Sequence, residues 1–172
     1  MKLSGTCVAV LVVAACRTTA LAADTQSLKG ISGLWILVEN LDADLQQFGL
    51  TKEELHAEIE DRLGLGGIAV EPPSASGAGP FLYLAVANIA VPPPGKRKLK
   101  AKARPAGITL YVRLELQQAV VLKRNPSSSL LSDTWHQSLM GYTEPARAGE
   151  TARKWVQELT ERFVRAYRAA NP

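Results

Sequence analysis

The chain has 172 residues, of which 47% are hydrophobic and 21% charged, and this length and composition fit one globular domain. It is too apolar to be disordered throughout. The formal charge of +4 is unevenly distributed, because six of the 20 Lys and Arg residues lie between Lys96 and Arg104 and the remainder carries more acidic than basic residues. A uniformly basic nucleic-acid-binding protein is therefore excluded.

A secretory signal is predicted from the first 23 residues. Lys2 supplies a positive charge, Val8–Ala15 forms an apolar run, and Ala20–Ala22 matches an A-x-A cleavage site. The apolar run is too short to span a bilayer, which takes about 20 residues. We therefore expect residues 1–22 to be a cleaved signal peptide and the mature protein to be exported, either to the periplasm or as a secreted protein.

The same residues also allow a lipoprotein signal. Val13–Cys16 is similar to the lipobox of bacterial lipoproteins, in which the cysteine carries the lipid and becomes the first residue. Residues 1–15 would then be removed, and lipidation of Cys16 would anchor the protein to a membrane. Cys7 and Cys16 are the only cysteines, so cleavage after Ala22 leaves no disulfide, no cysteine nucleophile and no thiolate metal site.

The first elements after the leader are a strand and a capped helix. Leu34–Leu41 is a short apolar run without helical period, which predicts a buried strand. Thr51 begins a capping box with Glu54, because its hydroxyl can accept a hydrogen bond from the Glu54 amide. Gly64 or Gly66–Gly67 is expected to end the helix. Its apolar stripe recurs every fourth residue, at Leu55, Ile59 and Leu63.

Three strands and a loop are predicted in the middle of the chain. Ile68–Val70 is a short strand that the following prolines stop. Phe81–Val91 is apolar on both alternating faces, so we expect a central strand that is covered on both sides. Residues 92–106 form a loop with three consecutive prolines and six basic residues. Ile108–Leu122 begins with five apolar residues that alternate with polar ones, which predicts a long strand with one face in water.

A turn, a strand and a helix complete the pattern. Asn125–Ser129 is predicted to be a turn, and Thr134–Tyr142 a further strand. Gly149–Ala169 has the period of an amphipathic helix, and Glu158–Arg162 and Glu161–Arg165 are favourable pairs four residues apart. The large apolar side chains share one face of this helix: Ala152, Trp155, Val156, Leu159, Phe163 and Tyr167.

The predicted order is β-α-β-β-β-β-α, which favours an α+β fold with a mostly antiparallel sheet and two helices packed on one face. We assign residues 23–172 to a single domain. Leu50–Leu55, with the stripe and the glycines that follow, resembles the opening helix of a family of exported bacterial α+β domains of unassigned function. The element order is also similar to that of small domains attached to envelope-assembly proteins. These resemblances imply a fold and carry over no catalytic residue.

His56 and His136 are the only histidines and therefore the main candidates for acid–base chemistry. His56 lies in the predicted helix and is expected to be partly exposed. His136 and Ser138 share one face of a strand, whereas alternation places Asp133 on the opposite face. A hydrolase that uses His136 is therefore the least favoured alternative, and no catalytic residue is assigned.

Two further clusters have some features of ligand sites. Asp42 and Asp44 lack the additional spaced ligands of a calcium loop, so we expect them to cap a turn. Gly64, Gly66 and Gly67 end a helix rather than begin one, which excludes a nucleotide-binding loop. We expect no metal and no cofactor.

The basic loop is the strongest candidate for a binding site. Its cations could contact anionic lipid, an anionic polysaccharide or another envelope protein with an acidic surface. Nucleic acid is not expected, because the loop has no aromatic residue for base stacking. We therefore expect a non-enzymatic binding or accessory domain of the bacterial cell envelope, and as the alternative an assembly partner that acts through protein–protein contacts. The candidate binding residues are Lys96, Arg97, Lys98, Lys100, Lys102 and Arg104.

Overall fold

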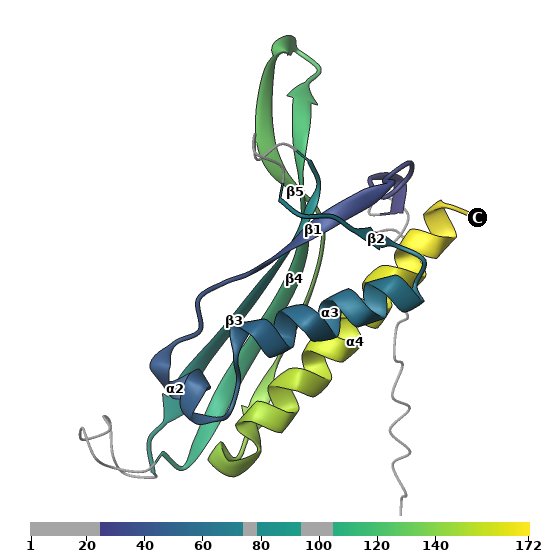
Figure 1. The fold of residues 1–172 in the computed structure, drawn as a ribbon. Coiled ribbons are helices and arrows are strands. Elements are labelled where there is room, and N and C mark those ends of the chain that lie inside the picture. Colours follow the sequence, from purple (N-terminus) through teal and green to yellow (C-terminus); the bar gives the residue numbers. More distant parts are fainter. Residues whose placement is uncertain (1–24, 74–78, 94–104) are drawn as a thin grey trace, which may run out of the picture.

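A five-stranded mixed sheet forms the centre of the structure, a computed structural model that describes residues 25–73, 79–93 and 105–172 (Figure 1). The strands lie in the order β2-β1-β3-β4-β5. Their bounds are Gly33–Val38 for β1, Ala69–Val70 for β2, Phe81–Val91 for β3, Gly107–Leu122 for β4 and Asn125–Thr143 for β5. The helices are α2 at Ala43–Gln47, α3 at Lys52–Leu65 and α4 at Ala148–Ala170, with a 3-10 turn at Pro145–Arg147 before α4.

The strand pairing confirms the predicted α+β fold. Strands β3, β4 and β5 form two long antiparallel ladders. Strand β1 pairs in parallel with both β2 and β3, because α3 lies between β1 and β2 in the chain and returns it to the same end of the sheet. Helices α3 and α4 both lie on one face of the sheet, as predicted (Figure 1). The short helix α2 was not predicted.

Local sequence signals account for α3. The Thr51 hydroxyl accepts a hydrogen bond from the Glu54 amide at 3.2 Å, so this part of the predicted cap is present. The helix ends at Leu65, and Gly67 follows with φ of +78°, a conformation that side chains with a Cβ rarely adopt. The predicted stripe is fully buried against the sheet: Leu55, Ile59 and Leu63.

The last helix supplies the largest fully buried side chain of the described core. Phe163 of α4 is fully buried, and its ring meets the Trp135 ring of β5 edge to face, with centroids 5.0 Å apart. The Tyr167 hydroxyl donates to the Ile31 carbonyl at 2.8 Å and ties the end of α4 to the segment before β1. The predicted docking face of this helix is therefore confirmed.

The prediction of a turn before the last strand is wrong. The predicted turn at Asn125–Ser129 belongs to β5, and the hairpin turns instead at Lys123 and Arg124. The reason is cross-strand pairing: Ser129 lies opposite Val121. After a register shift, Asn125 lies opposite Leu122. Pairing with a partner strand overrides the weak strand propensity of serine and asparagine.

Strand β3 is central, as predicted, but it is covered on one face only. Leu82 and Leu84 are fully buried beneath the helices, whereas Ile89 on the opposite face is 70% exposed. An apolar run shows which side chains tolerate burial, but it does not show whether other elements pack on both faces of the strand. The prediction that both faces of β3 are covered was therefore wrong. Within the described ranges, no helix is both long and apolar enough to cross a membrane.

Replacing Phe163 by Ala should lower the free energy of unfolding by about 4 kcal/mol, because the cavity lies where α4 meets the sheet. Urea denaturation followed by circular dichroism measures this loss. Arg147→Ala, at an exposed position before the same helix, should change stability by less than about 0.5 kcal/mol. A loss below about 1.5 kcal/mol for Phe163→Ala would show that this ring does not anchor the helix.

Candidate functional site

The sheet face opposite α3 and α4, here called the open face, carries the candidate site. Its side chains come from alternate positions of β1, β3, β4 and β5, and the register aligns them in rows across the sheet. Near the start of β4, one row joins Ile89, Thr109 and Tyr142, and the next joins Tyr111 with Met140. Met140 is 73% and Tyr142 62% exposed. Among the described residues, this half of the open face is therefore an uncovered apolar surface.

A charged network crosses the middle of the open face. Arg113 Nε lies 2.5 Å from Glu115 Oε1, and Arg113 Nη2 lies 2.9 Å from Asp133 Oδ2. Gln117 Nε2 donates to the second Glu115 oxygen at 2.6 Å. Glu115 is buried although it lies on the face predicted to be in water. The arginine and the amide supply the charge-assisted contacts that a buried carboxylate requires.

A bulge in β5 places Asp133 and His136 on the same face, which corrects the sequence prediction. Leu116 lies opposite Trp135 while Gln117 lies opposite Asp133, so Thr134 is an extra residue in β5. One extra residue reverses the alternation of side chains on one side of it. His136 Nδ1 consequently lies 3.2 Å from Asp133 Oδ2. The pattern of alternate residues gave no signal of this bulge.

The end of the open face nearest the β1 N-terminus is aromatic. The rings of Trp35 and Phe81 stack with centroids 4.3 Å apart. Burial, a hydrogen bond with Glu39 and the charges of Glu39 and Glu115 together raise the pKa of Tyr83 above its usual value. A shallow hollow of about 290 Å³ lies beside these rings. Its lining comes from four strands: Leu37, Phe81, Tyr83, Glu115, Gln117 and Leu131.

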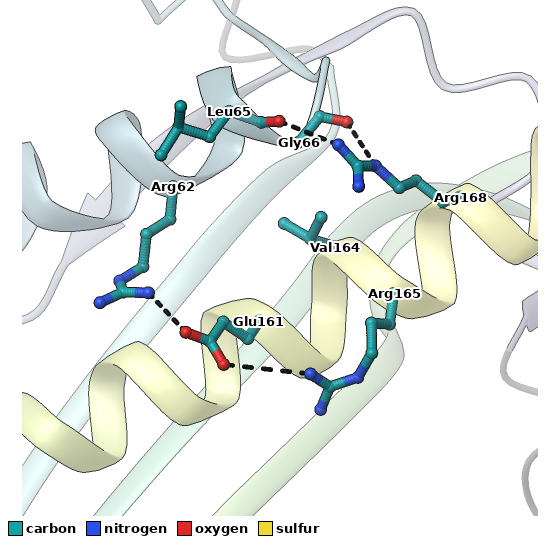
Figure 2. A pocket seen from close by; sticks show the side chains of 7 residues that line it. All are labelled: Arg62, Leu65, Gly66, Glu161, Val164, Arg165 and Arg168. Atoms are coloured by element: carbon teal, nitrogen blue, oxygen red, sulfur yellow. Dashed lines mark hydrogen bonds and ion pairs between the residues drawn. The ribbon is translucent and has the colours of Figure 1, made fainter.

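A second hollow of about 300 Å³ lies between the end of α3 and α4 (Figure 2). Arg168 donates to the carbonyls of Leu65 and Gly66 at 2.9 and 3.0 Å, and Arg62 lies 2.6 Å from Glu161. The arginines thus satisfy the last carbonyls of a helix and an opposing carboxylate. These contacts join two helices, and they leave the open face as the stronger candidate site.

The other predicted residues have structural roles or lie outside the described residues. His56 lies on α3, 3.6 Å from the Glu60 carboxylate, and is partly exposed as predicted. Asp42 occupies the cap position of α2, although its side chain makes no cap hydrogen bond. No cluster suited to a metal ion occurs in the described ranges. The leader and residues 94–104 of the basic loop lie outside the described residues. They include these predicted site residues: Cys16, Lys96, Arg97, Lys98, Lys100, Lys102 and Arg104.

No protein-family model and no curated protein matches the chain. The resemblance drawn from Leu50–Leu55 to exported bacterial domains therefore stays a prediction.

Replacing Arg113 by Leu should lower the free energy of unfolding by about 3 kcal/mol, because Glu115 would stay buried without its cation. Adding Glu115→Gln to that variant should restore at least half of the loss, since the neutral amide has no charge to compensate. Arg165→Leu, which removes an exposed pair, provides the control, with an effect below about 1 kcal/mol. Equal stability of Arg113→Leu and the parent chain in urea would contradict this account of the network.

Proposed function

We propose that this protein is an exported, non-enzymatic accessory domain that binds a partner protein through the open face of its sheet. The observation that supports the proposal most directly is the uncovered apolar half of that face, where Met140 and Tyr142 are mostly exposed. Exposed apolar patches of this kind on an otherwise packed domain mark interaction surfaces. Of the two functions expected from the sequence, the open face favours the assembly partner.

The composition of the face is typical of a protein interface. Tyrosine, tryptophan, methionine and arginine are enriched in the centres of interfaces, and Trp35, Tyr111, Arg113 and Met140 all belong to this face. The Arg113 network supplies a polar region with its hydrogen bonds already made. A partner could cover it without leaving a buried charge unpaired.

The pair of Asp133 and His136 offers weaker support for a hydrolase. Their contact resembles the half of a catalytic triad that orients the base. Arg113 forms an ion pair with the same Asp133 carboxylate, and His136 does not line the hollow beside Phe81. His136 has its hydrogen bond with Asp133, and among the described residues none joins it to Ser138, which lies two residues along on the same face. Binding therefore accounts for more of the face than catalysis does.

The proposed location follows from the leader. A cleaved signal peptide of residues 1–22 would deliver the domain to the periplasm or the medium, and lipidation of Cys16 would hold it at a membrane. The basic loop at 92–106 would add attraction to an anionic surface. It joins the end of β3 to the start of β4, so it enters and leaves the sheet beside the apolar half of the open face.

Mass spectrometry of the protein recovered from the cell envelope tests the proposed location. We expect a chain that begins at Ala23, because cleavage follows the A-x-A site. A lipidated chain that begins at Cys16 would agree with the proposed envelope location, but it would show that the protein is anchored to a membrane rather than soluble. Recovery of the intact chain, Met1 included, from the cytosol would contradict export.

Site-specific photocrosslinking in cells tests the binding face. A photoreactive amino acid at Met140 should give a discrete adduct of higher mass, because the partner would cover this side chain. The matched control is Lys154, an exposed residue of α4 on the other side of the molecule, where the same group should give no such adduct. Failure to crosslink from position 140, in a cell fraction that contains the folded protein, would rule out the open face as the binding surface.

A further inference from the structure

The antiparallel hairpin of β4 and β5 extends beyond the rest of the sheet as a two-stranded arm, Gln118–Ser132 (Figure 1). The last residue of β4 that pairs with β3 is Gln117, opposite Phe81. Beyond that row, β4 and β5 pair only with each other in the described residues. The base of the arm is held on the helix side, where Gln118 Nε2 donates to the Ser27 carbonyl at 3.0 Å.

The arm exposes apolar side chains on the same side as the open face. Val121 is 59% and Leu131 56% exposed, and Leu131 lines the hollow beside Phe81. A two-stranded ribbon without a packed face is at best marginally stable in water. The arm continues β4 and β5 away from the sheet, so it cannot fold back over the open face of its own chain.

The described part of the chain therefore has two uncovered apolar surfaces on one side of the same strands: the arm at one end and the half around Met140 at the other. From Gln117, the arm extends by five residues of β4, about 17 Å, and the start of β4 lies about 33 Å away in the opposite direction. We propose that two copies of this chain pack open face to open face about a twofold axis, with the arm of each copy on the apolar half of the other. This inference rests on the proposed binding role of the open face and names its partner.

The size of the surface suits a stable dimer. Strands β1, β3, β4 and β5 have 6, 11, 16 and 19 residues. At about 3.3 Å per residue and 4.8 Å between strands they present about 800 Å² on this face. Specific interfaces of standard size bury roughly the same area on each partner. Two sheets in contact through such faces form the layered packing of a β-sandwich.

The charges of the arm and of the open face also fit the proposed twofold arrangement of the two copies. Lys123 and Arg124 at the turn are the only charged residues of the arm. An axis that places the arm over the apolar half brings this turn to the far end of the partner's β5, where Glu144 is exposed. The same axis passes near the middle of the face, where Arg113 and Asp133 supply both signs of charge for contact with their counterparts.

Light scattering on the full chain after size-exclusion chromatography tests the dimer. The parent chain should have twice the mass of one copy at micromolar concentration. Leu131→Asp on the arm and Met140→Lys on the apolar half should each raise the dissociation constant at least tenfold, because both positions would be covered. Mixing these two variants should restore a dimer, since the new Asp of one copy then faces the new Lys of the other.

Leu65→Asp at the exposed end of α3 is the matched control and should leave the dimer unchanged. Circular dichroism melting of each variant separates loss of the interface from loss of the fold. A monomeric parent chain would overturn the inference, as would a dimer indifferent to both substitutions or a mixture that is not rescued. Adducts from position 140 to a different protein, with a monomeric chain, would overturn the dimer and leave the proposed function standing.

Discussion

The one-sided cover of the sheet is the constraint on which the other features depend. Helices α3 and α4 lie on the same face (Figure 1), and the fully buried apolar side chains of β1, β3 and β4 point toward them. A sheet of this size gains most of its stability by burying one apolar face. The opposite face must then be polar, covered by something else, or exposed at a cost in solubility. This molecule has a polar band there, between an aromatic end and an apolar end.

The bulge at Thr134 decides how the polar band is built. Without the extra residue, regular alternation would turn Asp133 toward the helices, where a carboxylate would find an apolar layer. The bulge turns it to the open face, where Arg113 and His136 both contact it. Arg113 can then form ion pairs with both Asp133 and Glu115, and these contacts offset the cost of burying Glu115. One local irregularity of the backbone thus permits a charged cluster in the middle of a sheet.

Much of the fold could be predicted because its signals are local. The stripe of α3, its Thr51 cap and the alternation along β4 each depend on residues close in sequence. The features that were missed depend on pairing between distant segments. The serine-rich start of β5 is a strand only because β4 lies beside it, and the bulge exists only in the register of that pair.

The candidate site was missed for a related reason. In the sequence, chemically distinctive residues stand out, and these are His136 and the cations of the basic loop. The structure shows a site made of ordinary residues, such as Met140, Tyr111 and Ile89, that gain significance only from their exposure in aligned rows. Sequence alone cannot separate a buried methionine from an exposed one when both occur in a strand that alternates in polarity.

The exposed apolar side chains of the arm favour binding of a partner protein over a catalytic or small-ligand site. Beyond Gln117 the β4 strand of the arm no longer pairs with β3, and Val121 and Leu131 stay in water although the chain has an apolar core that could bury such residues. Burying one such side chain contributes about 2 kcal/mol, and ordering each residue of an unsupported ribbon costs about 1 to 2 kcal/mol of backbone entropy. A contact that covers the arm and the apolar half together would offset this cost on both surfaces at once. A small ligand in the hollow beside Phe81 would reach neither the turn at Lys123 nor Met140, so a surface as extended as a second sheet fits the open face better.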